Sequence, residues 1–450
     1  MNNKRDMDNK RDTKRSKLLI SNVAASFVVK GWSAFIVLWM VPLTLTCLGS
    51  YKNGVWLTIS SILVWIDQMD IGLGNGLRNK LAIHMAHQQY EEARQIVSST
   101  LAMLICIVVP LLLILWALIA YGDVYGMLNV DPELIPELRT ALTAAVTLVC
   151  MTFVLKFIGN VYMGMQLPAV SNLLLALGQT VALILTALLY YTDQASFTAI
   201  VIANTAAPLL VYLIAYPYTF FKQFPMLRPS LKWVKMGAAM ELGYLGVKFF
   251  WLQVAALIQF ATANILISRF FTPEMVTPYQ IAYRYVSIVM IAFTVICMPF
   301  WNATTDAYER GDMDWIRRSS RRMNWMTMMI LGLLVVMVII SPWVYDIWIG
   351  DRCEVPMGMT AMMALYIFLM VLSLRYSYFL NGVGALRLQL YMTVMTVVFI
   401  PLAWLVSRET HNILCFMGVM CFCIAPSIVV NMLQFNKILK GRATGWWRIK

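Results

Sequence analysis

The sequence predicts an all-α integral membrane protein, and three features carry that prediction. Hydrophobic residues make up 60% of the 450 positions and charged residues only 13%, whereas soluble domains are about half apolar and about a quarter charged. Windows of about 20 apolar residues, enough to cross roughly 30 Å of hydrocarbon, recur along the whole chain. The segments between them reach about 20 residues at most, far below the size of a folded domain. They leave no room for a soluble catalytic module or an ATP-hydrolysing domain.

Hydropathy predicts about twelve membrane-spanning helices. Each is predominantly apolar over a length that fits the bilayer, and a short connection separates it from the next. The expected helices cover residues 18–48, 54–77, 99–120, 140–164, 169–191, 197–220, 239–268, 278–301, 325–348, 357–380, 386–406 and 412–434.

A shift of 218 residues superimposes features of the two halves of the chain. Val29-Lys30 falls on Val247-Lys248, and Lys222 falls on Lys440. The same shift places Gly164 on Gly382 and Ala207-Pro208 on Ala425-Pro426. The matches preserve helix number and membrane depth, so we expect two pseudo-symmetric six-helix lobes with the same orientation. Transporters built from such repeats bind their substrate at the interface between the halves.

The expected division of the chain follows from these helices and from the charged segments between them. Basic cytoplasmic segments precede, join and follow the two lobes. The predicted parts are a basic N-terminal tail (1–17), an N-lobe (18–220), a basic linker (221–238), a C-lobe (239–434) and a basic C-terminal tail (435–450).

The basic residues also predict the orientation in the membrane. Of the 35 lysines and arginines, 25 lie in the two tails and in the connections on the same side, and five lie in connections on the opposite side. By the positive-inside rule both termini are cytoplasmic. The net charge of +13 therefore indicates attraction to the anionic headgroups of membrane lipids rather than to nucleic acid.

Metal and cofactor chemistry is not indicated. The eight cysteines lie mostly within expected spans and form no CxxC pair, which favours neither disulfides nor a metal site. His84 and His87 are three residues apart in a cytoplasmic segment, but the further ligands that zinc requires are missing nearby. We expect no cofactor.

Ionisable residues within the expected spans are the most informative feature. Each is costly against lipid, so we expect these side chains to face an interior cavity or one another. Five are cations and three are acids. The eight residues are Lys30, Lys156, Lys248, Arg284, Arg375, Asp67, Asp70 and Glu241.

Two roles remain open for these charges. At about 1.5 Å per residue, Lys30 lies roughly 18 Å and Asp67 roughly 15 Å from the cytoplasmic edge, so the two side chains can pair structurally. Alternatively, a cavity lined by Lys30, Lys248 and Arg284, with Lys156 and Arg375 on further helices, binds an anionic ligand. Arginine suits bidentate contacts to phosphate. Asp67, Asp70 and Glu241 are then candidates for coupling to a proton or sodium ion.

Three glycines in the stretch WIDQMDIGLGNGLRNK, residues 65–80, superficially match a phosphate-binding loop. A dinucleotide loop follows a strand and opens a helix within a soluble unit, whereas these glycines end an apolar span. Gly72 and Gly76 instead form a GxxxG pattern, which permits close helix packing. The pattern predicts a tightly packed helix end beside two acids.

The run D-x-GLGNGLRNKLA, Asp70 to Ala82, resembles a signature of bacterial polysaccharide-biosynthesis membrane proteins. These are lipid-linked oligosaccharide (O-antigen type) flippases of the MATE-like, or MOP, superfamily. Trp56, Trp65, the 6+6 architecture and the length of the chain are also similar. The resemblance implies a V-shaped pair of six-helix lobes that open alternately to the two sides of the membrane.

The implied cargo is an undecaprenyl-pyrophosphate-linked oligosaccharide repeat unit, and polysaccharide polymerase and chain-length proteins are implied partners. Related flippases use cations on helices one and eight for the pyrophosphate, which points to Lys30 and Arg284, with Lys248 in support. Lysine at position 30 departs from the arginine of a relative. Aromatic faces such as Trp32, Phe249 and Trp251 are candidates for stacking on sugars, although packing is the simpler role for them.

Two other functions compete with a flippase. A drug/cation antiporter of the same fold favours an acidic cavity, whereas cations outnumber acids inside these spans. An integral-membrane glycan polymerase or acyltransferase usually needs a long external loop or a catalytic histidine and acid. Here the longest external connection has about 20 residues, short for either purpose, and only His411 lies on that side. The sequence therefore predicts a transporter rather than an enzyme.

Overall fold

The computed structural model describes residues 2–67, 73–235, 237, 262–383, 385, 387–392 and 394–447. Within these ranges the regular secondary structure is helical and contains no strand, which confirms the all-α prediction. The chain divides into two compact units. Unit 1 comprises Met1–Gly49 and Ile62–Trp251, and unit 2 comprises Ser50–Ser61 and Leu252–Lys450.

The described part of the chain contains eight helices that are long and apolar enough to cross a membrane. This finding confirms a multi-pass membrane protein. The eight segments are Val28–Asp67, Tyr90–Tyr121, Leu138–Gly164, Pro168–Tyr191, Phe197–Gln223, Met313–Arg352, Met357–Gly382 and Ile413–Leu439.

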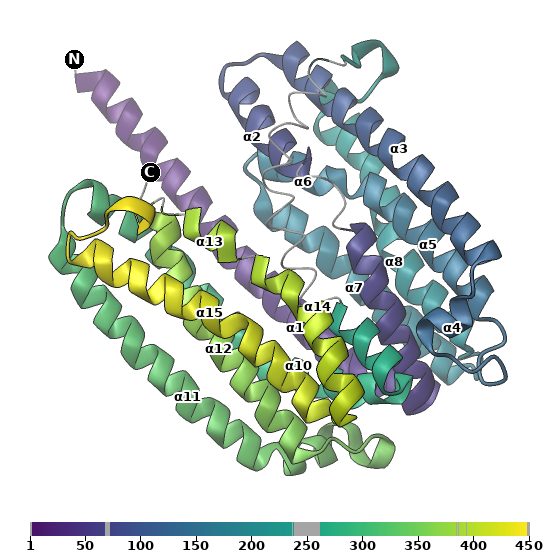
Figure 1. Ribbon diagram of the computed structural model, residues 1–450. Coiled ribbons are helices and arrows are strands. Elements are labelled where there is room, and N and C mark those ends of the chain that lie inside the picture. The colour runs from purple at the N-terminus through teal and green to yellow at the C-terminus, as the bar shows by residue number, and fades with distance from the viewer. Residues whose placement is uncertain are drawn as a thin grey trace. The chain divides into compact units, whose positions relative to one another are not determined.

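Unit 1 contains the first half of the helices (Figure 1). Helices α7 and α8, which follow one another in the sequence, pack closely. Helix α8 also packs on α5, and α5 packs on α3. The elements are the two outer parts of α1 (Asn2–Asp67), α2 (Leu73–Ala86), α3 (Tyr90–Tyr121), α4 (Val124–Leu128), α5 (Leu138–Leu155), α6 (Phe157–Gly164), α7 (Pro168–Tyr191), α8 (Phe197–Pro217), a π-helical turn (Tyr218–Gln223) and two short 3₁₀ turns (Pro225–Leu227, Leu231–Trp233).

Local sequence explains several ends and contacts in unit 1. Pro168 opens α7, where the missing N–H of proline is harmless. Ser196 caps α8 by accepting a hydrogen bond from the Ala199 amide. Gly178 of α7 leaves room for Pro208 of α8, whose Cα would lie 3.1 Å from an added Cβ. Small residues of this kind let membrane helices approach closely.

Helix α1 joins two expected spans, 18–48 and 54–77, into one element with a single break. Gly49 has φ 68° and ψ 175°, a backbone conformation that glycine adopts without steric cost. The sequence predicted a break between the two spans. It predicted a loop at 49–53, whereas the structure has one non-helical residue, Gly49. The helix is described as far as Asp67, and residues 68–72 lie outside the described ranges.

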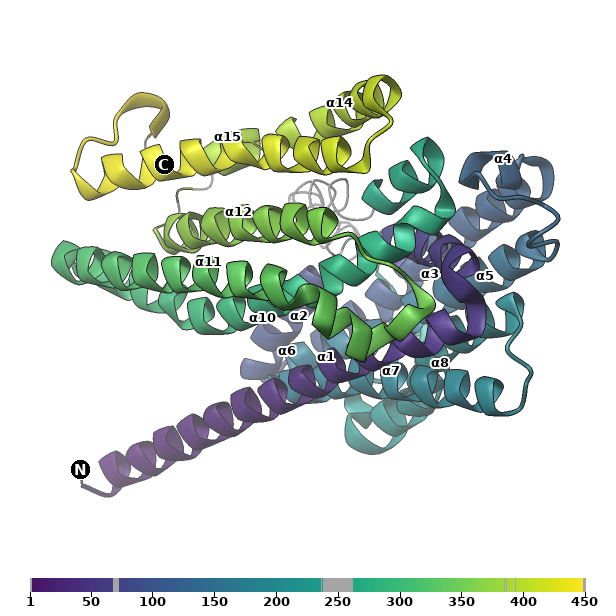
Figure 2. The same cartoon turned by 90° about the horizontal axis from the view of Figure 1, so that it is seen from below.

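Unit 2 contains the second half of the helices, and α11, α12 and α15 run side by side in two views (Figures 1 and 2). Helix α12 packs against α10, α11 and α15, so it forms the centre of the unit. The elements are a helical stretch at 262–270, α10 (Pro273–Glu309), α11 (Met313–Ile349), a 3₁₀ turn (Gly350–Arg352), α12 (Met357–Gly382), α13 (Arg387–Met392), α14 (Val394–Thr410), α15 (Ile413–Leu439) and a 3₁₀ turn (Gly445–Trp447).

The segment Ser50–Ser61 of α1 packs within unit 2 rather than with the rest of α1. Gly54 makes the contact possible, since a Cβ there would lie 1.8 Å from the Pro273 carbonyl oxygen. The Thr277 hydroxyl donates to the Ser50 carbonyl over 2.7 Å. Asn264 donates to the Ser61 hydroxyl over 2.7 Å and accepts from Gln280 over 2.7 Å. A close backbone approach and a buried polar chain therefore anchor this segment.

Several features follow the predicted repeat. Gly164 is the last residue of α6, and Gly382 is the last residue of α12. Pro208 lies inside α8 and Pro426 inside α15. Helix ends and prolines therefore recur at corresponding positions in the two units.

Three predicted spans differ from the observed helices in a specific way. The span 140–164 is interrupted at Lys156, which separates α5 from α6. The spans 278–301 and 325–348 are parts of longer helices of 37 residues each, α10 and α11. Charged residues lower the mean hydropathy at the ends of α10 and α11, so the predicted spans stop before the helices do.

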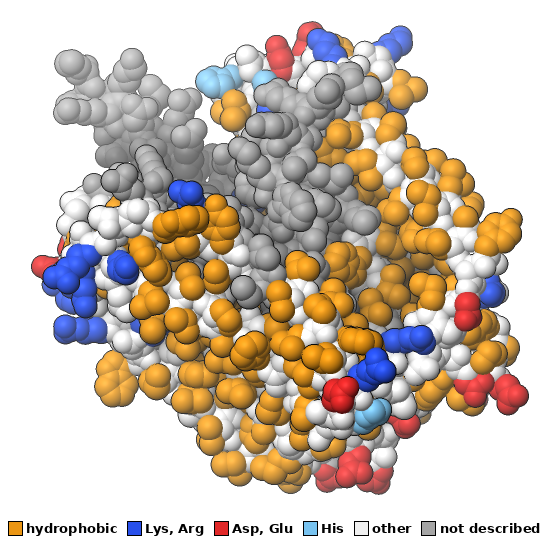
Figure 3. Space-filling view, viewed as in Figure 1, with side chains coloured by type: hydrophobic (Ala, Val, Ile, Leu, Met, Phe, Trp, Pro, Cys, Tyr) orange, Lys and Arg blue, Asp and Glu red, His pale blue; other side chains and the backbone are white. Residues whose placement is uncertain are grey.

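The surface is consistent with a membrane environment. On the face shown in Figure 3, hydrophobic side chains cover broad continuous areas, and most charged side chains lie near the periphery. Many large apolar side chains on the long helices are exposed, among them Leu113, Ile184, Ile214, Val336 and Ile339. Apolar patches of this extent are rare on soluble monomers.

Candidate functional site

The structure describes six of the ten residues that the sequence analysis selected. Asp70, Gly72, Glu241 and Lys248 lie outside the described residues, as do the aromatic candidates Phe249 and Trp251. The roles expected of them remain proposals. The six described residues fall in different parts of the two units.

Asp67 and Lys156 form an ion pair inside unit 1. The Lys156 Nζ lies 2.7 Å from the Asp67 Oδ1 and also donates to the Asp67 backbone carbonyl over 2.6 Å. The ammonium further lies 5.4 Å from the centre of the Phe153 ring. The lysine therefore neutralises the carboxylate and donates to a backbone carbonyl of α1.

This pairing differs from the sequence-based hypothesis, which considered Lys30 as the partner of Asp67. The structure gives the carboxylate a partner from the break between α5 and α6 instead. The Asp67 and Lys156 side chains retain 37% and 25% of their exposure. The pair is therefore reachable by water or by a ligand, as a coupling site requires.

Lys30 is exposed near the middle of the expected first span, beside an aromatic stripe on the same helix. We define this aromatic stripe as Trp32, Phe35 and Trp39, which are 49%, 48% and 58% exposed. Successive ring centres lie 5.5 and 5.6 Å apart. The Trp32 indole N–H donates to the Thr180 hydroxyl of α7 over 3.2 Å. The hydrogen bond holds the first ring of the stripe in place.

Trp32 lies too deep to belong to an interfacial belt. It is 14 residues into the expected span 18–48, or roughly 21 Å at 1.5 Å per residue, within a hydrocarbon core of roughly 30 Å. Aromatic belts lie at headgroup level. Three exposed rings that begin at this depth, with the Trp32 indole hydrogen-bonded, instead have the form of a surface on which a sugar or another flat apolar face can pack.

Arg284 lies on α10 in unit 2 and is partly buried. Its neighbour Tyr285 is buried and donates to the Met337 carbonyl of α11 over 3.0 Å. Arg284 precedes Tyr285 and leaves α10 about 100° round the helix from it. The structure thus keeps this cation within the unit rather than fully exposed at its surface.

Arg375 lies on α12 and is 8% exposed. Its guanidinium carbon lies 4.8 Å from the centre of the Tyr376 ring, a cation–π distance. The side chain lines a cavity of about 20 Å³. That volume holds a water-sized group and not a diphosphate.

Gly76 is buried in α2, which packs on α3 and α6. The close approach in this region is visible at Gly164 of α6, where an added Cβ would lie 2.9 Å from a Leu81 methyl carbon of α2. The contact between α2 and α6 thus depends on Gly164, and the packing role expected of Gly72 and Gly76 stays a prediction.

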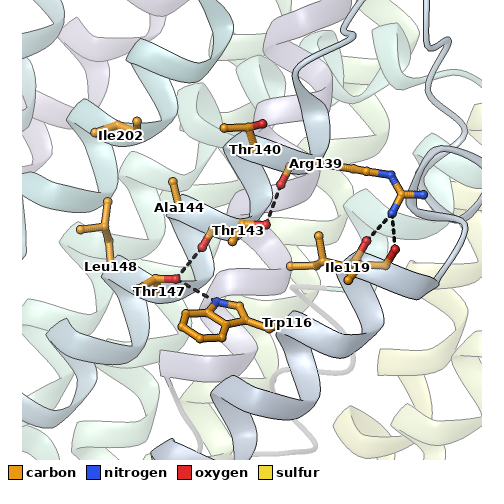
Figure 4. Close-up of a pocket in the computed structure, with 10 residues that line it drawn as sticks. Trp116, Ile119, Arg139, Thr140, Thr143, Ala144, Thr147, Leu148 and Ile202 are labelled. Atoms are coloured by element: carbon orange, nitrogen blue, oxygen red, sulfur yellow. Dashed lines mark hydrogen bonds between the residues drawn. The ribbon is translucent and has the colours of Figure 1, made fainter.

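Unit 1 also contains a groove that the sequence analysis did not find (Figure 4). It has a volume of about 810 Å³ and lies between α3, α5 and α8. Thr140, Thr143 and Thr147 of α5 line it at the spacing i, i+3, i+7, which places them on one helix face. This spacing was the available signal in the sequence.

The polar groups of the groove are largely bonded within unit 1. The Thr147 hydroxyl donates to the Thr143 carbonyl over 2.7 Å and accepts from the Trp116 indole N–H over 3.0 Å. Arg139 donates to the carbonyls of Ile119, Ala120 and Gly122 at the end of α3. The groove therefore offers few unmet hydrogen bonds, and its chemistry suits hydrocarbon better than sugar or phosphate.

The described site residues thus separate into distinct places. Lys156 and Asp67 are brought together, Lys30 shares its helix with the aromatic stripe, and Arg284 and Arg375 belong to unit 2. Among the described residues, no group of three or more histidines, cysteines and acids could hold a metal ion.

These features define a polytopic, all-helical membrane protein of two units, with charged side chains on helices of both units. Comparison with protein-family models and with curated proteins finds no match. Solved structures do match, and they identify the fold.

The fold is that of MATE transporters. The chain is similar to an inward-facing multidrug resistance MATE family transporter of the MOP superfamily, with a TM-score of 0.77 and 14% identity over 91% of this chain and 96% of that one. It is also similar to an outward-facing structure of such a transporter, with a TM-score of 0.60 and 13% identity over 95% and 96%. A MATE protein in the straight conformation gives a TM-score of 0.61 at 13% identity, over 94% and 96%.

Proposed function

We propose that this protein is a transporter that moves undecaprenyl-pyrophosphate-linked oligosaccharide units across the bacterial inner membrane by alternating access. The lipid tail stays in the bilayer while the charged headgroup and sugars cross through a polar path. A pyrophosphate and several sugars cannot cross hydrocarbon unaided, because their desolvation is too unfavourable. The protein therefore has to supply cations for the phosphates and surfaces for the sugars.

One observation supports this cargo above all: Lys30 and the aromatic stripe lie on the same membrane-embedded stretch of α1 and are exposed together. An exposed cation suits a phosphate, and exposed rings pack against the apolar faces of sugars. Arg284 and Lys248 are the further cations proposed for the pyrophosphate. The MATE-like fold supports the mechanism of alternating access, with Asp67 as the proposed proton or sodium site.

A multidrug antiporter is the second candidate, and a specific observation favours it as well. Two of the similar solved structures are multidrug resistance transporters, and the exposed rings of the aromatic stripe also suit flat drug molecules. The two candidates differ in the charge of the cargo. An anionic cargo requires Lys30 and Arg284 to be positive, whereas a cationic drug gains nothing from them.

The test is surface glycan display in the native bacterium after deletion of the chromosomal gene and return of single variants. Lys30→Ala and Arg284→Ala should abolish display while the protein remains in the membrane at normal levels. Trp32→Ala and Phe35→Ala should reduce display without affecting the phosphate contact. Lys232→Ala and Arg318→Ala, which remove exposed cations elsewhere, serve as matched controls and should display normally.

The two candidates separate when efflux of a cationic dye is measured in the same strains. A flippase predicts lost glycan and unchanged dye efflux after gene deletion. Normal glycan in both Lys30→Ala and Arg284→Ala, together with efflux that depends on the gene, would reject the flippase and support the antiporter.

A further inference from the structure

We infer that unit 2 holds a binding site for one small monovalent anion, such as chloride, at the buried guanidinium of Arg375. This site is separate from the proposed cargo path and does not depend on it. The argument rests on the burial of the charge, on the size and lining of the cavity, and on the surrounding basic sequence.

The guanidinium of Arg375 is a buried cation without a carboxylate partner among the described residues. The side chain is 8% exposed, and the ion pairs of the described residues leave it unpaired. Its contact with the Tyr376 ring, 4.8 Å from the ring centre, compensates only part of the lost hydration. A buried charge normally has a counter-ion, and here that partner has to come from outside the described side chains.

The cavity beside Arg375 has the size and the lining for a small anion. Its volume of about 20 Å³ exceeds the roughly 10–15 Å³ that one water molecule requires, and chloride is only slightly larger than water. The hydroxyls of Thr304, Ser319 and Ser320 line the same cavity. Hydroxyls and a guanidinium are all hydrogen-bond donors, which is the set that an anion needs.

The same small volume excludes larger anions. Inorganic phosphate has five heavy atoms, and the pyrophosphate of a lipid-linked sugar has more, so neither fits. Aromatic and apolar side chains, including Phe300, Met323, Phe379 and Phe435, also line the cavity. Arg375 therefore takes a different ligand from the one proposed for Lys30 and Arg284.

The two serines of the cavity belong to a basic run, RRSSRR, at residues 317–322 of α11. Ser319 is buried and Ser320 partly buried, while the four arginines around them are exposed. Charges of one sign around an opening raise the local concentration of the opposite ion. The run thus attracts anions on its exposed face and presents hydroxyls to the cavity on its buried face.

The experiment measures thermal unfolding of the full-length protein in nanodiscs, in sodium chloride and in sodium gluconate at equal ionic strength. Wild type should unfold a few degrees higher in chloride, because a ligand that binds only the folded state stabilises it. Bromide should replace chloride, and gluconate is too large to do so. Broadening of the ³⁵Cl NMR line by the protein gives a second, direct measure of binding.

Variants decide whether the effect comes from this cavity. Arg375→Met should lose both the chloride-dependent shift and the NMR broadening, whereas Arg318→Met removes an exposed arginine of the basic run and should keep both. If Arg375→Met does not fold, Ser319→Val supplies the test, with chloride affinity expected to fall several-fold. Equal unfolding temperatures of wild type in chloride and gluconate, without line broadening, would overturn the proposal. Loss of the response in Arg318→Met to the same extent as in Arg375→Met would also overturn it.

Discussion

Lys156 reaches across unit 1 to Asp67, with its Nζ 2.7 Å from one carboxylate oxygen and 2.6 Å from the backbone carbonyl of the same residue. One ammonium thus serves both as the counter-ion of an acid and as a donor to the backbone of α1. The interruption between α5 and α6 falls at this lysine. A charge that looked like a candidate ligand therefore has a structural partner.

The Asp67–Lys156 pair predicts that removing both charges is less harmful than removing one. Asp67→Asn or Lys156→Met alone should lower the stability by about 1 kcal/mol, less than the 3–5 kcal/mol of a fully buried pair, because both side chains keep some exposure. The double variant should recover part of this loss. Thermal unfolding of the four proteins in nanodiscs measures the coupling, and strictly additive losses would contradict a direct pair.

The same pair also predicts a result in transport. If Asp67 exchanges a proton or sodium ion with the solvent, transport in vesicles should respond to a gradient of that ion and lose the response in Asp67→Asn. Lys156→Met should alter the ion dependence while Lys222→Met, which removes a cation from the π-helical turn, should not. If the wild-type protein transports at the same rate with and without an ion gradient, Asp67 is not a coupling site.

The surroundings of Gly54 and Gly332 predict opposite effects of a glycine-to-alanine substitution on stability. Gly54→Ala places a Cβ 1.8 Å from the Pro273 carbonyl oxygen, so a backbone has to move and the protein should be strongly destabilised. Gly332→Ala on α11 meets nothing within 4 Å and should be neutral or stabilising by about 0.5–1 kcal/mol, as alanine favours the helix. The yield of folded protein by size-exclusion chromatography and its unfolding temperature distinguish the two.

The buried polar chain in unit 2 predicts a further loss of stability. Asn264 is 3% exposed and joins Ser61 to Gln280. Asn264→Leu removes both bonds and takes the side-chain acceptor from Gln280, while the Ser61 hydroxyl keeps its bond to the Leu57 carbonyl. The loss should cost about 1–3 kcal/mol. Asn324→Leu, at an exposed position of α11, is the matched control and should stay within about 0.5 kcal/mol. Equal unfolding temperatures for the two variants would mean that the chain contributes nothing.

The expected orientation predicts which connections can be labelled from outside the cell. In a background without the eight native cysteines, Glu133→Cys should react with a membrane-impermeant maleimide in intact cells. Arg318→Cys should react only after permeabilisation. Both positions are exposed on the protein, so accessibility depends on the membrane alone. The reverse pattern would invert the orientation derived from the basic residues.

Much of the fold could be predicted from the sequence because it depends on length and hydropathy. Pro168–Tyr191 and Met357–Gly382 agree closely with the expected spans 169–191 and 357–380. Disagreements arose where helices extend beyond the hydrocarbon, as in α10 and α11, and where a helix is interrupted within it, at Lys156. Hydropathy averages over a window, so it detects neither a helix that continues into water nor a one-residue interruption.

The sequence by itself determined that this chain crosses a membrane many times, that its two halves correspond, and which side chains are charged at membrane depth. These properties follow from composition and from position along each helix. Only the tertiary structure decided that Asp67 pairs with Lys156, that Arg375 lines a cavity of about 20 Å³, and that Ser50–Ser61 packs with the second unit. Counting residues gives the depth of a side chain, whereas its partners depend on the rotation of each helix and on the neighbours against which it packs.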